Sequence, residues 1–353
     1  MQGYDKSDLN SSGIPPLLER VESQDQWLHK RSRIFDRWME VVGGLPSREP
    51  IQYEVLSESQ ESDHLRLHLV YKTAYGDKVP AYLLIPSDGS ALAQGKRYPA
   101  VLALHPTAPE GKDDVATPSG REGRKYGLEL VSRGYVVLAP DTITAGERVY
   151  AGSEPYQTAP FYEQYKEWSA VGKMMTDHQY GLDLLTTLDY VDPERIGAIG
   201  HSLGGYNAFF LAGADERIKA VVSSCGFSTF AGDEEMHRWG QRDWFSHLPV
   251  VSQEAEKGRV PFEFHEIAAL AAPTPFFNWS AQQDRIFPHW KLILEALGEL
   301  DKLYKWMGAE QAFVSLMGNS GHDFPDEIRL LAYRFLDRWL NNDKPAKTSD
   351  PTP

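Results

Sequence analysis

Five residues in the middle of the chain have the types and spacing of a serine nucleophile site. The segment 200–204 reads GHSLG, so that Ser202 stands two positions from a glycine on either side. In a tight turn from a strand into a helix, such glycines remove Cβ atoms that would clash, and the serine hydroxyl is exposed. A strand-like run at 195–199 precedes the turn, and a helix-forming run at 207–212 follows it. The pattern predicts that Ser202 attacks a carbonyl carbon.

A serine hydroxyl is a weak nucleophile until a base accepts its proton. In enzymes with this turn, the acid and then the histidine follow the serine along the chain. His322 lies in the loop 318–325, between an apolar run and the last predicted helix, and is the predicted base. His265 lies in a long insertion and His289 at the start of a predicted helix. We therefore expect structural roles for these two histidines.

The acid that orients the histidine is expected in the loop after the apolar run 275–279. Asp284 is the single carboxylate of that loop and is the predicted acid. Asp141 follows an earlier apolar run and remains the alternative, because some enzymes place the acid on an earlier strand. Asp323 is adjacent to His322 and is poorly placed to reach its ring nitrogen.

Acyl transfer also needs two N–H donors for the negative oxygen that develops during attack. The backbone N–H of Leu203, which follows the nucleophile, is predicted to be one donor. The loop after the apolar run 100–104 begins with His105, Pro106 and Thr107. Proline has no N–H, so Thr107 is the predicted second donor. His105 is expected to support this loop and to border the substrate pocket.

The elements that must position these residues have the pattern of an α/β protein. From residue 98 onward, short continuous apolar runs alternate with helical stretches, which is typical of parallel strands buried between helices. The segments 51–56, 64–72 and 79–85 contain alternating apolar positions instead and predict antiparallel strands. We expect a mostly parallel central sheet with antiparallel N-terminal strands and helices on both faces.

Three parts are predicted along the chain: an N-terminal helical extension (1–50), a catalytic domain (51–340) and a flexible tail (341–353). Within the catalytic domain, the segment of about 227–270 follows a strand end and is rich in aromatic residues. Because ligand pockets favour aromatic linings, we expect a lid whose Trp239 and Trp244 line the substrate pocket. The alternative is that this segment packs on the catalytic domain and does not contact the substrate.

Composition excludes several kinds of partner. The 353 residues carry a net charge of −14, which argues against nucleic acid or an anionic membrane. Cys225 is the single cysteine, so no internal disulfide can form. A signal-peptide pattern is missing, and no apolar run reaches the roughly 18 residues of a spanning helix, so a cytoplasmic location is expected. Metal and nucleotide motifs are missing as well, so we expect no cofactor and no metal.

Several stretches together resemble the dienelactone-hydrolase and acetyl-xylan-esterase-like branch of the α/β-hydrolases, over about residues 75–340. They are VPAYLLIP at 79–86, HPT at 105–107, GYVVLAPD at 134–141 and the GHSLG turn. The resemblance implies an α/β-hydrolase fold with a lid insertion and the hydrolysis of a small-molecule carboxylic ester through an acyl-enzyme. Pro106 and Thr274 stand where relatives often have glycine and arginine, so the resemblance does not identify the substrate.

Two other functions remain open at this point. The first is a peptidase or amidase of the same fold, and the second is a catalytically inactive homologue that only binds a ligand. A homo-oligomer is also compatible with the sequence.

Overall fold

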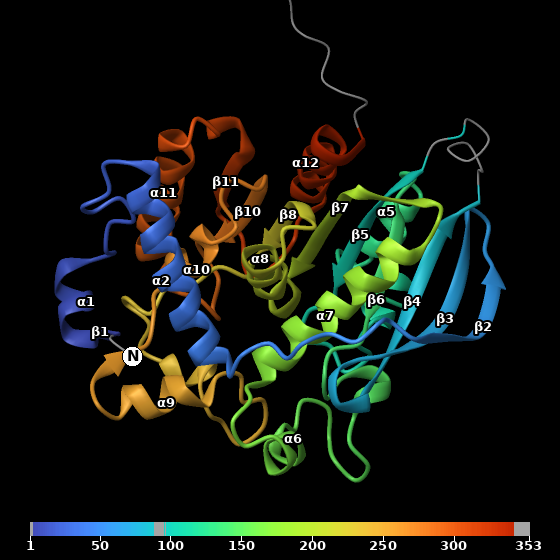
Figure 1. Cartoon of the computed structure of the whole chain (residues 1–353), viewed down its shortest axis with the longest axis horizontal. Helices are drawn as coiled ribbons and strands as arrows, with labels where there is room; N and C mark the ends of the chain where they lie inside the picture. The colour runs from blue at the N-terminus through green and yellow to red at the C-terminus, as the bar shows by residue number, and fades with distance from the viewer. Residues whose placement is uncertain (1–2, 88–94, 96, 342–353) are drawn as a thin grey trace, which may run out of the picture.

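The computed structural model describes residues 3–87, 95 and 97–341, and a single large sheet runs through it (Figure 1). Within the described residues, nine strands pair in the order β11-β10-β8-β7-β5-β6-β4-β3-β2. These strands are β2 (Tyr53–Gln60), β3 (His64–Lys72), β4 (Lys78–Pro86), β5 (Tyr98–Leu104), β6 (Val136–Pro140), β7 (Val191–His201), β8 (Ile218–Ser224), β10 (Phe276–Ala281) and β11 (Phe313–Gly318).

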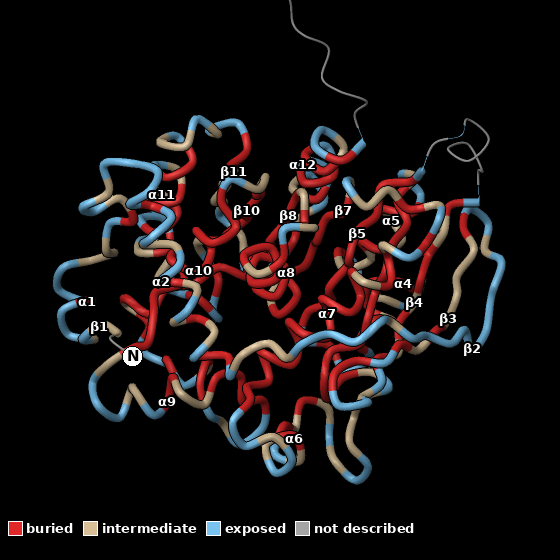
Figure 2. The backbone as a smooth tube through the Cα atoms, in the orientation of Figure 1, coloured by how far each residue is buried: buried red, intermediate tan, exposed pale blue. Residues whose placement is uncertain are grey.

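The sheet is mixed in the way that the sequence predicts. Strands β5, β6, β7, β8, β10 and β11 pair in parallel, whereas β2, β3 and β4 pair antiparallel and join the parallel part through β6. Every residue of β5, β6 and β10 is buried, but every residue of the edge strand β2 is exposed (Figure 2). The continuous apolar runs are thus central strands, and the alternating runs lie toward the edge.

Helices cover both faces of the sheet. On one face, α7, α8, α10 and α11 pack with α2 against alternate strand positions such as Leu102. On the other face, α4, α5 and α12 pack against the intervening positions such as Val101. The longer helices are α2 (Gln24–Val42), α7 (Ala170–Thr187), α8 (Leu203–Ala214), α11 (Trp290–Trp306) and α12 (Asp326–Leu336), and the shorter ones are α1 (Lys6–Ser12), α4 (Asp113–Ala116), α5 (Tyr126–Val131), α6 (Ala159–Gln164), α9 (Pro249–Ala255) and α10 (Phe264–Ala269).

The N-terminal helix packs on the body of the protein. Ser23 caps α2 by accepting a hydrogen bond from Gln26 N, and Gly43 ends the helix in a left-handed conformation. The ring of Trp38 lies 4.8 Å from that of Phe210 and 5.2 Å from that of Phe262. The longest helix of the predicted N-terminal extension is therefore α2, which begins after its Ser23 cap and shares the core with the catalytic part. Except for residue 341, the predicted tail (341–353) lies outside the described residues.

The insertion at 227–270 contains α9, α10 and the short strand β9 (Arg259–Val260), which pairs with β1 (Tyr4–Asp5). Much of it is core, because Phe230, Phe262 and Phe264 are buried in one cluster. None of the helices in the described part of the chain is long and apolar enough to span a bilayer. The predicted α/β fold class is confirmed.

Candidate active site

Ser202 stands on a strained turn between β7 and α8. Its backbone has φ 54° and ψ −115°, a conformation that residues other than glycine rarely adopt. A Cβ atom on Gly200 would lie 2.2 Å from the carbonyl of Gly204, and one on Gly204 would lie 1.9 Å from Leu104 O. Both glycines are therefore required by close backbone contacts, as the GHSLG pattern predicts. The N–H of Ser202 donates to Ser224 O at 2.7 Å and holds the turn in place.

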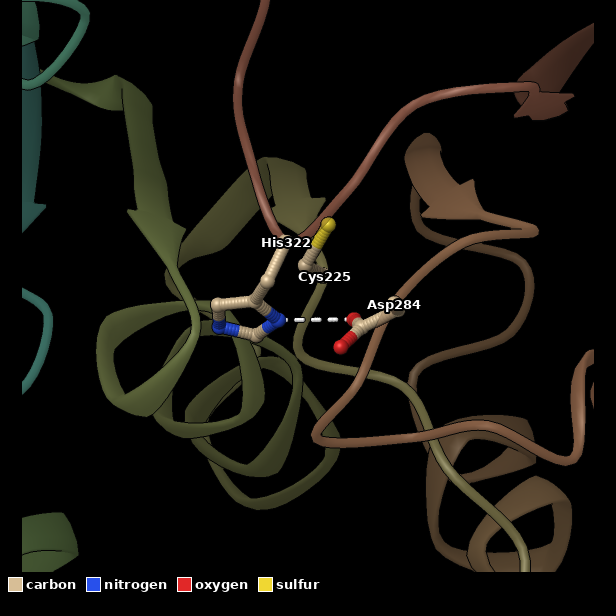
Figure 3. Close-up of side chains that lie close together, drawn as sticks. All are labelled: Cys225, Asp284 and His322. Carbon is tan, nitrogen blue, oxygen red and sulfur yellow. Dashed lines mark hydrogen bonds and ion pairs between the residues drawn. The ribbon is translucent and has the colours of Figure 1, made fainter.

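His322 and Asp284 are in direct contact (Figure 3). The ring nitrogen Nδ1 of His322 lies 2.7 Å from Oδ2 of Asp284, and the side chain of Asp284 is almost fully buried. The other oxygen, Oδ1, accepts backbone N–H groups from Ile286 at 2.7 Å and Phe287 at 3.2 Å. These bonds hold the carboxylate in one orientation.

The two loops that carry this pair follow neighbouring parallel strands, β10 and β11. Gln282 N donates to Gly318 O, and Gln283 N donates to Ser320 O, so the loops are bonded to each other. The second ring nitrogen of His322, Nε2, has no hydrogen-bond partner among the described residues. Ser202 and His322 line the same cavity, although no hydrogen bond joins them in the part of the chain that the structure describes. Bonds of this kind are often long before substrate binds.

The alternative acids are engaged elsewhere. Asp141 is fully buried and accepts from Lys112 N at 2.7 Å, Lys112 Nζ at 2.8 Å and Glu147 N at 3.1 Å. Asp323 pairs with Arg124 at 3.0 Å. Neither carboxylate is bonded to His322, so the geometry favours Asp284.

The two other candidate histidines also have structural partners. His265 Nε2 lies 2.8 Å from Pro15 O and connects the insertion to the N-terminal segment. His289 Nε2 lies 3.1 Å from Ser228 Oγ. Burial lowers the pKa of both rings.

The predicted oxyanion donors border the cavity on two sides. Leu203 begins α8, and the first N–H groups of a helix have no acceptor within it. Thr107 lies on the loop after β5, and its N–H has no acceptor among the described residues. The next residue is held firmly, because Ala108 N donates to the Tyr156 hydroxyl at 2.7 Å, and that hydroxyl donates to Ala108 O at 2.9 Å.

The prediction that His105 borders the substrate pocket is wrong. His105 is fully buried, and its ring is not among the described residues that line the cavity. Nε2 accepts from Thr142 N at 3.0 Å, which leaves the proton on Nδ1, and Nδ1 lies 2.7 Å from Pro106 O. The physical reason is that the loop turns back over the ring and uses both of its nitrogens. His105 therefore supports the loop that carries Thr107.

The cavity has a volume of about 480 Å³. Trp239 and Trp244 both line it, but Trp239 is only 2% exposed whereas Trp244 is 44% exposed. Sequence reasoning missed part of the wall, namely Tyr206, His247, Arg121, Arg124, Arg238 and Arg242. Tyr206 could have been found, because it lies one helical turn after Ser202 on the same helix face. Nothing in the sequence marked the arginines.

Cys225 lies beside the histidine and the acid (Figure 3). Potential ligand atoms of Cys225, Asp284 and His322 all lie within 4.8 Å of one another, the one such group in the described part of the chain. Burial raises the pKa of the Cys225 thiol, and its Sγ donates to Asp323 O. A protonated thiol next to an already bonded carboxylate and imidazole is a poor metal ligand set, so we assign no metal to this group.

A protein-family model matches the part of the chain that carries this site. The model of the prolyl oligopeptidase family matches residues 125–342, a range that contains Ser202, Asp284 and His322. The chain belongs to the prolyl oligopeptidase family. It is thus a hydrolase of the α/β-hydrolase fold, as the sequence predicts; the finer dienelactone-hydrolase likeness stays a prediction.

Several known proteins and solved structures are similar to this chain, to different extents. YtaP of Bacillus subtilis is 29% identical over 88% of this chain and 99% of its own length. Dipeptidyl-peptidase 5 of Porphyromonas gingivalis is 27% identical, over 54% of this chain and 25% of its own length. The structure of a glucuronoyl esterase from Solibacter usitatus has a TM-score of 0.69 at 19% identity, over 92% of this chain and 97% of the esterase. At that identity, the likeness shows a shared fold.

Proposed function

We propose that the chain is a serine esterase that hydrolyses carboxylic esters through an acyl-enzyme. One observation carries the proposal. Ser202, on its strained turn, and His322, bonded to a buried Asp284, line the same cavity. These are the parts that nucleophilic acyl transfer needs.

Each residue has a distinct role in the proposed reaction. Asp284 accepts a hydrogen bond from Nδ1–H of His322, which keeps the ring proton on Nδ1 and leaves the lone pair on Nε2. Nε2 takes the proton of the Ser202 hydroxyl as Oγ attacks the ester carbonyl. The backbone N–H groups of Leu203 and Thr107 donate to the oxygen that becomes negative. His322 then protonates the leaving alcohol, and a water molecule hydrolyses the acyl-enzyme with His322 again as base.

A peptidase or amidase is the second candidate, and the family membership favours it. An ester is preferred for a physical reason. A peptidase that recognises a free amino terminus needs a carboxylate near the nucleophile to pair with the ammonium group. Among the described residues that line the cavity, there is no aspartate and no glutamate. The shared fold with a glucuronoyl esterase is also compatible with ester hydrolysis.

Labelling with a fluorophosphonate and a substrate panel test the proposal. The wild-type protein should react with the probe and should hydrolyse 4-nitrophenyl acetate, whereas Ser202→Ala should lose labelling and about 10⁴ or more of the ester rate. Ser57→Ala, on the exposed strand β2, serves as the matched control and should keep both. Peptide 4-nitroanilides are assayed in parallel.

Three results would contradict the proposal in different ways. An unlabelled, inactive wild-type protein would indicate the inactive homologue. Faster cleavage of anilides than of esters would indicate the peptidase. Equal ester hydrolysis by Ser202→Ala and wild type would show that another residue is the nucleophile.

A further inference from the structure

Cationic side chains line the cavity over Ser202, although the whole chain is acidic. Four arginines line it, together with His201, His247 and His322, and no carboxylate does so among the described residues. The net charge of the chain is −14. Any of these charges that no carboxylate balances would attract an anion to this place on the surface.

Three of the four arginines are neutralised by nearby carboxylates. Arg121 is bonded to Asp114 at 2.7 Å, and Arg124 to Asp323 at 3.0 Å. Arg238 lies 3.3 Å from Asp233 and 3.2 Å from Glu235. Their charges are therefore already balanced within the protein, and these arginines position loops at the rim of the cavity.

Arg242 is different, because no carboxylate pairs with it in the part of the chain that the structure describes. Its Nε donates to Phe245 O at 2.9 Å, and its Nη2 lies 3.4 Å from His247 Nδ1. The guanidinium also stacks over Trp244 at 4.6 Å from the ring centroid. A guanidinium has five N–H donors, so the other donors are left without an acceptor among the described residues.

The neighbours of Arg242 do not neutralise its charge. Burial, with the charge of Arg242, lowers the pKa of His247 to about 3, so this ring is neutral and accepts at Nδ1. Its Nε2 lies 2.5 Å from the Tyr206 hydroxyl, and Tyr206 N donates to Ser202 O. Arg242 is thus connected to the nucleophile turn through two buried side chains. Burial lowers the pKa of Arg242 itself, but a guanidinium remains charged in proteins.

A half-buried cation without a counter-ion is costly unless a ligand supplies the negative charge. We propose that Arg242 binds a carboxylate carried by the substrate, so that the preferred substrates are esters with an anionic group on the acyl or the alcohol part. The planar guanidinium, stacked and fixed at one edge, presents its other edge for a paired contact with two carboxylate oxygens. This inference rests on the proposed esterase function and adds the substrate class.

Two pairs of esters test the inference, each with a carboxylate in one member and a methyl group in the other. For the acyl side, mono-4-nitrophenyl glutarate is compared with 4-nitrophenyl pentanoate. For the alcohol side, 3-acetoxybenzoate is compared with 3-tolyl acetate. In at least one pair, kcat/KM of the wild-type protein should favour the anionic ester about ten- to a hundredfold. The pair that shows the preference identifies the side that carries the anion.

Variants assign the preference to Arg242. Arg242→Gln should remove most of the anionic-to-neutral ratio, and Arg242→Lys should keep part of it, because a lysine retains the charge but not the planar fork. Arg338→Gln is the matched control, since Arg338 lies over Trp339 at 5.3 Å in the same kind of stack, outside the cavity. It should leave the ratio unchanged. Melting temperatures of all variants check folding.

A ratio near one in both pairs would overturn the inference, as would a preference that survives Arg242→Gln. Failure of the esterase proposal would look different, because the neutral esters would not be hydrolysed either. In that case, calorimetric titration of the wild-type protein with glutarate still tests whether Arg242 binds a carboxylate. Binding that weakens at least tenfold in Arg242→Gln supports the anion site, and equal or absent binding overturns it.

Discussion

At the scale of single residues, the environment of a carboxylate distinguishes the two candidate acids. Asp284 accepts two backbone N–H groups on one oxygen and the ring of His322 on the other. Asp141 has its oxygens committed to Lys112 and to Glu147 N. Lys112 is only 2% exposed, and it would lose its main counter-ion if the charge of Asp141 were removed. These contacts suit Asp284 to the proposed reaction, and they suit Asp141 to a role in stability.

We therefore predict opposite effects for the two asparagine variants. Asp284→Asn keeps the shape but presents an N–H₂ group to His322, which favours the wrong tautomer, and kcat should fall by about 10⁴. Asp141→Asn should instead lower the melting temperature, because a buried ion pair loses one partner. Rates on 4-nitrophenyl acetate and thermal unfolding measure both effects. An inactive, fully stable Asp141→Asn beside an active Asp284→Asn would reverse the assignment.

At the scale of elements, the segment between β6 and α7 holds the loop that follows β5. Tyr156 is buried, has φ 65° and donates its backbone N–H to Thr144 O at 2.7 Å. Its hydroxyl bonds both the N–H and the C=O of Ala108, next to the predicted donor Thr107. His105 holds the other end of the same loop. This segment thus positions the loop that carries one of the two predicted oxyanion donors.

Loss of the Tyr156 hydroxyl should affect the chemical step. Tyr156→Phe frees Ala108 and lets Thr107 move, so kcat should fall about tenfold while KM stays similar, because an oxyanion donor acts in the transition state. Tyr162→Phe is the matched control. Its hydroxyl bonds Ser246 O, His247 O and Ala170 N but does not touch this loop. Equal losses of kcat in both variants would point to general destabilisation instead.

At the scale of the whole molecule, buried histidines link stability to pH. Burial lowers the pKa of His178 to about 3, and burial with the nearby Arg242 lowers that of His247 to about 3. In the unfolded chain, both bind protons below about pH 6.5. Burial acts oppositely on Glu263 and raises its pKa to about 7, so the folded state takes up one proton in the same range.

The unfolded chain binds more protons than the folded protein in this pH range, so the protein is predicted to lose stability on acidification. Between pH 6 and pH 5, the unfolded chain holds protons on His178 and His247 that the folded state does not bind, and the proton on folded Glu263 offsets one of them. Burial also lowers the pKa of His105, His201, His265 and His289, which adds to the excess of protons on the unfolded chain. The free energy of unfolding should therefore fall by at least about 1.4 kcal/mol for each pH unit of acidification. Urea unfolding at pH 7, 6 and 5 measures this slope, and Glu263→Gln should make it steeper. A stability that is constant or rises toward pH 5 would contradict the prediction.

The nucleophile turn could be predicted from the sequence because its physics is local. The close contact of Gly200 with Gly204 depends on residues that are neighbours in the chain, and the flanking strand and helix have their own periodicity. The sheet was also predictable, since burial on one or both faces leaves a visible pattern of apolar residues. The contact between Asp284 and His322 could also be predicted, because their loops follow two neighbouring parallel strands.

Only the tertiary structure decided what surrounds these residues. The sequence could not tell that His105 is buried behind its loop without lining the cavity. Nor could it tell that, of the four arginines that line the cavity, Arg242 has no carboxylate partner among the described residues. Both facts depend on side chains from distant segments, whose charges and hydrogen bonds leave no periodic pattern along the chain. The sequence by itself therefore determined the fold and the predicted chemistry, and the packing of the insertions decided the shape and charge of the pocket.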